Sequence, residues 1–349
     1  MSKQSSLAIK FSETKQDNQS YLLLKTCLWV GVACACMLYG QYIRAAGGCG
    51  SVCLPLEALS PERTSMTKNQ YRIAFSLEHA DFDNFRAGDD DITNMGGNQA
   101  VITQGTLFFN YGFAEQWTAS ILLPYVRKRQ QTNNFGTRIA EGVSDISVFT
   151  QYEYLQPSLS SKRSATVGLG VKFPTGSIDE PSDSNLLPPA FQAGSGAYDI
   201  IPTATYYKSV NTGAIFGDIF WRIPLEENKR GYKFGPELEL NIGYEHHLFS
   251  KTDRFSLLVG ASLLHAENDK DNNGILPGRL RDGTNVLNTG GDFIDFVFGF
   301  RSQFSKQFSL QLRLSVPVYE DWNGDSENNV GQVAPDLTSQ LNLVYTSLN

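Results

Sequence analysis

The feature that most constrains the fold of this chain is an alternation of apolar and polar residues that recurs from residue 71 to residue 345. The run 198–207 is representative: one face is apolar with an aromatic residue near each end, and the other face is mostly small and polar. A period of two predicts a β-strand with two different faces. The apolar face of such a strand points to the core of a soluble sheet, or to lipid in an outer-membrane barrel whose polar face lines the lumen.

Twelve such runs follow one another along the chain. Each is about ten residues long, which is the length that a tilted strand needs to cross a bilayer. They cover residues 71–78, 101–111, 117–125, 145–154, 165–173, 198–207, 215–223, 237–245, 255–263, 294–300, 308–318 and 337–345. An even number of strands is typical of bacterial single-chain barrels.

The connections between these runs are alternately short and long, as in an outer-membrane barrel, where short turns face the periplasm and long loops face outside. Short turns are expected at 112–115, 156–163, 209–213, 248–254 and 303–307, and long loops at 84–98, 128–143, 175–196, 225–233, 267–290 and 320–334. The sequence therefore predicts an all-β fold: a single closed antiparallel transmembrane β-barrel of about 12 strands, with long extracellular loops and short periplasmic turns. A large soluble sandwich or propeller is the alternative, and we find no internal repeat of the kind that a propeller has.

The N-terminal part of the chain differs from the rest. Residues 26–40 are apolar and follow a basic residue, but the stretch is too short to span a bilayer as a helix. We interpret residues 1–46 as a signal peptide, with an uncleaved N-terminal anchor as the alternative. Residues 47–69 are then a periplasmic segment that could fold into the barrel as a plug, and residues 70–349 form the barrel.

Charge and cysteine content bound the partners and the compartment. The formal net charge is −7, and removal of residues 1–46 takes away five basic and two acidic residues, which leaves −10. Nucleic acid is not an expected partner, because binding it would require a basic face. The expected partners are outer-membrane lipid and lipopolysaccharide, the barrel-assembly machinery and a small-molecule substrate. Cys49 and Cys53 remain after cleavage and could form a disulfide in an oxidising compartment.

Four short motifs carry a resemblance to a known family. They are 142–145, which leads into the run ending at Tyr154, together with 172–176, 194–199 and 235–244. In their order and spacing these motifs resemble the outer-membrane barrel family of phenol-degradation (MetA-pathway) proteins, also described as transporters. The resemblance covers the chain from about residue 71 onward. It implies a location in the outer membrane of a Gram-negative bacterium and a role in transport.

The hairpins predict a row of charges on the lumen side of the wall. Facing residues of an antiparallel pair have a constant sum of residue numbers, which is set by the centre of the turn. This rule places Asp145, Lys172, Asp199, Arg222 and Glu237 side by side on five adjacent strands, toward the outer end. The row could brace the wall by ion pairs, since lone charges in a confined lumen are costly, or it could form a constriction that filters what passes.

Other motifs were weaker candidates. Asp269, Asp271 and Asn273 match the first half of a calcium loop, but Leu280 replaces the glutamate of its twelfth position.

No cofactor is expected. Passive passage of small, hydrophobic or aromatic molecules is the predicted function. A lipid-modifying enzyme that would need a serine beside His265 is one alternative, and a structural or adhesive surface protein is the other.

Overall fold

The computed structural model describes residues 65–158, 162–182, 185–249, 252–276 and 281–348. The predicted signal peptide, Cys49, Cys53 and most of the 47–69 segment lie outside the described residues. Within the described part of the chain, we find no helix that is both long and apolar enough to cross a membrane.

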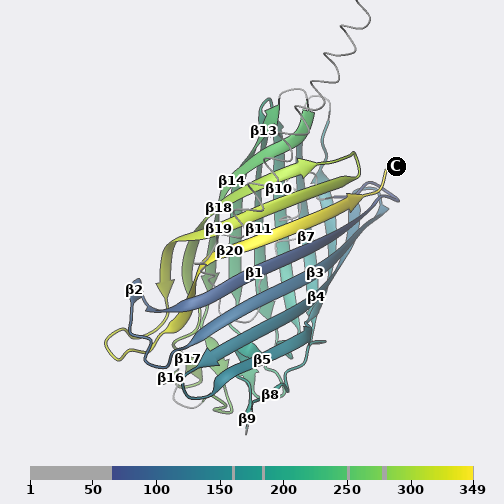
Figure 1. The fold of residues 1–349 in the computed structure, drawn as a ribbon. Coiled ribbons are helices and arrows are strands. Elements are labelled where there is room, and N and C mark those ends of the chain that lie inside the picture. The colour runs from purple at the N-terminus through teal and green to yellow at the C-terminus, as the bar shows by residue number, and fades with distance from the viewer. Residues whose placement is uncertain (1–64, 159–161, 183–184, 250–251, 277–280, 349) are drawn as a thin grey trace, which may run out of the picture. The chain divides into compact units, whose positions relative to one another are not determined.

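Twelve long antiparallel strands form one closed barrel, which confirms the predicted fold class. Each strand pairs with its neighbours in sequence order, and β1 pairs with both β3 and β20, so the sheet has no open edge between its first and last strands. Figure 1 shows the blue β1 beside the yellow β20. The strands are β1 (Tyr71–Ala87), β3 (Gln99–Ala114), β4 (Trp117–Thr132), β6 (Ile146–Leu155), β7 (Arg163–Phe173), β10 (Asp199–Val210), β11 (Gly213–Pro224), β13 (Glu237–Phe249), β14 (Thr252–Ala266), β18 (Gly291–Gln303), β19 (Phe308–Trp322) and β20 (Gln332–Thr346).

The exterior of the barrel is apolar, as the alternation predicted. Ile73, Phe75 and Leu77 on β1 are exposed, while Ala74 and Ser76 between them are buried against the interior. The same pattern continues around the wall, and near the periplasmic end outward-facing rings of neighbouring strands contact one another, as in the pair Phe308 and Tyr345 with ring centroids 4.9 Å apart. A lipid-facing apolar band with interfacial aromatic residues is typical of outer-membrane barrels.

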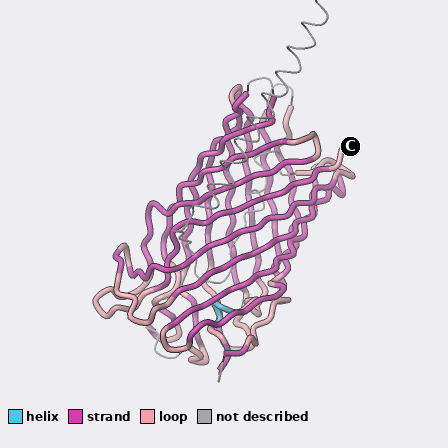
Figure 2. The backbone as a smooth tube through the Cα atoms, viewed as in Figure 1, coloured by secondary structure: helices cyan, strands magenta, loops and turns pink. Residues whose placement is uncertain are grey.

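The extracellular connections contain additional short elements. These are β2 (Asp90–Asp91), β5 (Gly136–Val143), β8 (Pro181–Ser182), β9 (Asn185–Leu186), the 3₁₀ turn η1 (Pro189–Phe191), β12 (Tyr232–Lys233), β15 (Asp269–Asp271), β16 (Arg281–Asp282) and β17 (Asn285–Val286). Figure 2 shows η1, in cyan, toward the end of the barrel where the long loops lie. The segments β12, β15, β17 and β16 form a small separate sheet.

The prediction of a loop at 128–143 is wrong. Strand β4 continues to Thr132, and β5 turns back to pair with it, so most of this connection is a β-hairpin. Strands β1 and β19 likewise extend further than their apolar runs. In the last part of β4, exposed outward positions such as Arg127 and Arg129 carry charged side chains, so the alternation of apolar and polar residues stops although the strand continues.

Candidate functional site

The five charges predicted to lie together form a continuous chain of ion pairs at the outer end of the lumen, here called the mouth row. Lys172 Nζ lies 2.6 Å from Asp199 Oδ2 and 3.5 Å from Asp145 Oδ2, and Arg222 Nη1 lies 3.3 Å from Asp199 Oδ2. Arg222 also pairs with Glu237, to which its Nε donates over 3.1 Å. Four of these side chains are buried and Glu237 is partly buried, which means that little water screens the row.

The strand register explains how the mouth row assembles. Lys172 is paired directly with Asp199, and Arg222 with Glu237. The other two contacts are displaced along the strand, because Ser147 rather than Asp145 faces Lys172, and Pro224 faces Asp199. Long lysine and arginine side chains span these offsets, so the predicted order of charges survives an error of two residues in the expected pairing.

The loop between β7 and β10, described at residues 174–182 and 185–198, folds against the interior and is here called the inserted loop. Leu187, Phe191 and Ala193 of this loop are buried in one cluster with lumen-facing residues of the wall. We call this the mouth apolar cluster; its wall members are Ala80, Phe82, Ala100, Ile102, Val126 and Ala140. Polar contacts add to it, since Lys128 Nζ donates to the Ala190 carbonyl over 3.0 Å. The inserted loop therefore fills part of the mouth.

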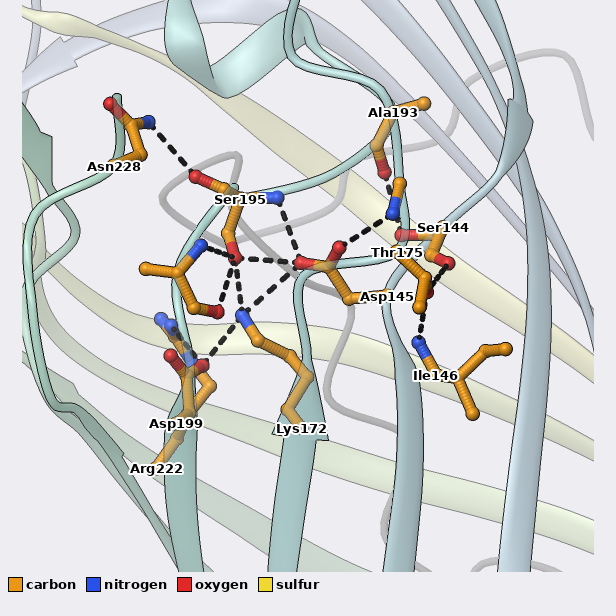
Figure 3. A network of polar contacts seen from close by, with 12 residues as sticks. Ser144, Asp145, Ile146, Lys172, Thr175, Ala193, Ser195, Asp199, Arg222 and Asn228 are labelled. Carbon is orange, nitrogen blue, oxygen red and sulfur yellow. Dashed lines mark hydrogen bonds and ion pairs between the residues drawn. The ribbon is translucent and has the colours of Figure 1, made fainter. Parts of the chain in front are cut away.

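The two ends of the inserted loop meet at a neck held by Asp145 (Figure 3). Its Oδ1 accepts from the Gly176 amide at 2.9 Å, and its Oδ2 accepts from the Ser195 amide at 2.8 Å and the Ser195 hydroxyl at 2.6 Å. Lys172 Nζ donates to that hydroxyl over 2.8 Å. The neck is also tight, because a Cβ on Gly176 would lie 2.6 Å from the Gly194 Cα. Ser195 thus links the mouth row to the inserted loop.

Arg230, in the connection between β11 and β13, forms a hydrogen bond with the inserted loop. Its Nη1 donates to the Leu187 carbonyl over 3.0 Å. Burial lowers the pKa of this guanidinium, and the nearby carboxylates of Asp179 and Asp271 oppose that shift. The side chain stays charged, since arginine has a pKa far above neutrality.

The interior is not uniformly polar, contrary to the simple lipid-out, polar-in expectation. A second cluster of buried apolar side chains faces the lumen below the mouth, and we call it the lumen apolar cluster; its members are Ala74, Phe108, Leu122, Phe149, Ile201, Phe220 and Val344. Strand β4 connects the two clusters, because Leu122, Pro124 and Val126 follow one another on its lumen face. In the sequence these residues occupy the alternate strand positions that face the lumen, so the alternation could have indicated an apolar patch there.

Glycine 170 makes room for one ring of the lumen apolar cluster. A Cβ at this position would lie 2.3 Å from Cε1 of Phe149. We expect Gly170→Ala to destabilise the barrel by about 1–3 kcal/mol through overpacking, measured as a lower urea midpoint in detergent micelles. Gly142→Ala is the control, because a Cβ there meets no atom within 4 Å. Adding Phe149→Leu to Gly170→Ala should restore most of the loss, and a loss that persists would contradict this explanation.

The three weak calcium candidates form hydrogen bonds within the extracellular loops, and Asn273 Nδ2 donates to the Arg230 carbonyl over 3.1 Å. Asp269 accepts from the Gly235 amide and the Tyr232 hydroxyl, and Asp271 accepts from two backbone amides and from Arg281 Nη2. Burial raises the pKa of Asp269 to about 6, and its hydrogen bonds with Tyr232 and Gly235 oppose the shift. Among the described residues no group of three or more histidine, cysteine, aspartate or glutamate side chains is suited to a metal ion.

Comparison with known proteins places this barrel in a family. The family model described as "Putative MetA-pathway of phenol degradation" matches residues 82–331, which is more than two thirds of the chain. The chain belongs to this family. The matched region contains the mouth row, the inserted loop and Asp145 at its neck, so the resemblance seen in the sequence motifs is confirmed.

A solved structure of an outer-membrane channel has the same fold. The crystal structure of the COG4313 outer membrane channel from Pseudomonas putida F1 is 14% identical, with a TM-score of 0.61, and the match covers 81% of this MetA-pathway family member and 97% of that chain. The transport unit of the autotransporter AIDA-I from Escherichia coli is 11% identical over 85% of this chain and 94% of that one, with a TM-score of 0.46. The first likeness supports the outer-membrane barrel fold, and the second is too distant to add to it.

Proposed function

We propose that this outer-membrane barrel lets small hydrophobic or aromatic molecules cross the membrane passively. The observation that carries the proposal is the apolar track on the lumen side of β4, where Leu122, Pro124 and Val126 connect the mouth apolar cluster to the lumen apolar cluster. An apolar molecule gains free energy by leaving water for such a surface. Within this proposal the mouth row serves as a constriction by holding the inserted loop across the mouth.

The alternative of a lipid-modifying enzyme depended on a serine beside His265. In the described part of the chain, the hydrogen bond of this histidine is to a carboxylate: its Nδ1 donates to Asp292 Oδ1 over 2.6 Å, and both side chains are exposed. Such chemistry needs a hydroxyl hydrogen-bonded to the histidine ring, and the described hydrogen bonds of His265 include none. The channel interpretation is therefore the one that the interior geometry supports.

The proposal can be tested with N-phenyl-1-naphthylamine, an apolar aromatic dye. An intact outer membrane largely excludes this dye, and its fluorescence rises once it enters an apolar environment inside the cell envelope. Cells of a Gram-negative host that express the chain should take up the dye faster than cells with an empty vector. Val126→Thr combined with Leu122→Asn should slow the added uptake about fivefold, because a polar group buried on the track costs about 1 kcal/mol. Uptake no faster than the empty vector would contradict the proposal.

A matched control makes the opposite change, from a polar to an apolar side chain, elsewhere in the lumen. Thr106→Val removes a buried hydroxyl from β3 without changing the width of the lumen, and it should not slow the dye. Swelling of liposomes in a sugar solution provides the second control. If the barrel admits a sugar as readily as the dye, the lumen is an open water-filled pore, and selectivity for hydrophobic molecules is ruled out.

A further inference from the structure

Below the mouth row, four carboxylates on the lumen side have no ion-pair partner among the described residues. One is Asp295 on β18, and the other three interact with the same arginine. These three are Glu78 on β1, Asp218 on β11 and Glu239 on β13. Arg313 on β19 interacts with all three electrostatically, but none of its nitrogen atoms forms a described ion pair with them. Elsewhere in the same lumen the chain does pair its charges, as Arg301 Nη2 lies 2.5 Å from Glu245 Oε1.

An amide in the middle of these carboxylates is also unsatisfied. Asn241 is buried, and its Nδ2 donates to Asp218 Oδ1 and to Glu239 Oε1, each over 2.9 Å. Within the described part of the chain, its own Oδ1 has no hydrogen-bond partner. The hydroxyl of Ser262 donates to the same Glu239 oxygen over 3.3 Å. A buried acceptor without a donor costs about 1–3 kcal/mol. Among the described residues the buried Nε of Arg313 also has no hydrogen-bond partner, so the guanidinium does not satisfy the Asn241 oxygen.

Three carboxylates outnumber the single guanidinium of Arg313 that interacts with them, so a ligand that fits this level must supply positive charge and a donor for Asn241 Oδ1. A metal ion does not fit, since the described acidic residues offer no group of three arranged to coordinate one. A nitrogen cation meets both requirements, because its N–H groups can donate to carboxylate oxygens and to the free Asn241 Oδ1, and charge-assisted hydrogen bonds are the strong ones. Phe220, two residues from Asp218 on the same lumen face, adds an aromatic surface beside the carboxylates.

We propose that Glu78, Asp218, Glu239 and Asn241 form a binding site for an ammonium group in the middle of the lumen. This inference goes beyond the proposed function and does not depend on it, because binding can be measured without any molecule crossing the membrane. A ligand that binds the folded barrel and not the unfolded chain raises its stability, which gives a direct measurement on the full barrel in detergent micelles.

The test compares thermal unfolding in ammonium chloride, potassium chloride and tetramethylammonium chloride at equal ionic strength. Ammonium should raise the midpoint by about 2–4 °C relative to tetramethylammonium, which has the same charge and no N–H group. Glu239→Gln and Glu78→Gln should each remove this difference and should raise the midpoint without ammonium, because each removes an unpaired carboxylate. Glu141→Gln is the control, since Glu141 and its partner Arg127 are both largely exposed.

Several outcomes would overturn the proposal. Equal midpoints in ammonium and tetramethylammonium would show a general salt effect without hydrogen bonding. An equal effect of potassium and ammonium would show attraction of any small cation. An ammonium shift that survives both Glu239→Gln and Glu78→Gln would place the binding elsewhere. None of these outcomes bears on the dye uptake that tests passage, so the two proposals stand or fall separately.

Discussion

Replacing Arg222 with methionine is expected to destabilise the barrel by about 3–5 kcal/mol. Arg222 contacts Asp199 and Glu237 and also donates to the Gly235 carbonyl over 3.4 Å. Its loss leaves Asp199, which is 1% exposed, with Lys172 as its remaining described ion-pair partner. Removing one partner from a buried ion pair is costly because the other charge stays buried. The urea midpoint in detergent micelles measures the effect.

The control for Arg222→Met is the same substitution on the outer surface. Arg127 lies 3.4 Å from Glu141, and the two side chains are 60% and 55% exposed. An exposed pair contributes about 0–1 kcal/mol, so Arg127→Met should change the midpoint little. If the two variants lose the same stability, the mouth row does not act as a buried network.

The second large effect is expected on conductance. Replacing residues 178–192 of the inserted loop with a short glycine-serine linker should raise single-channel conductance several-fold in a planar bilayer. The reason is that Leu187 and Phe191, the two large side chains that the inserted loop contributes to the mouth apolar cluster, are removed together. The wall should remain folded, because the twelve strands and their pairings lie outside the deleted stretch.

A matched deletion distinguishes the inserted loop from extracellular loops in general. Residues 93–97 connect β2 to β3, contribute no residue to either apolar cluster, and can be shortened in the same way. That variant should conduct like the unmodified chain. Conductance that rises equally in both variants, or in neither, would show that the inserted loop does not limit flow.

The strands and the mouth row could be predicted from the sequence because both depend on simple geometry. Alternation shows which residues face lipid, and the constant index sum shows which residues face one another. Lys172 and Asp199 were placed correctly by this rule alone. Bulges and turn details shift the pairing by a residue or two, which is why Asp145 contacts Lys172 from a neighbouring position rather than a facing one.

The inserted loop and the apolar interior could not be predicted by the same rule. The alternation of residues shows which side chains of a strand face the lumen, but it does not predict where a long loop between two strands folds. The signal in the loop was its content of apolar residues, such as Leu187 and Phe191, which a solvated extracellular loop does not need. For the interior, Phe108 and Phe149 occupy positions that face the lumen, yet their significance depends on neighbours from distant strands.

The neck of the inserted loop has a consequence for the timing of opening. One carboxylate, that of Asp145, holds the amide at the start of the loop through one oxygen and the amide at its end through the other. Rotation of that side chain breaks both contacts in a single event, so the two ends are released together. Packed interfaces of this kind switch between discrete arrangements and do not deform gradually. Current records from the unmodified barrel should therefore show abrupt steps between two levels. In Asp145→Ala the time spent at the lower level should shorten, because the contacts that hold the inserted loop in place are lost.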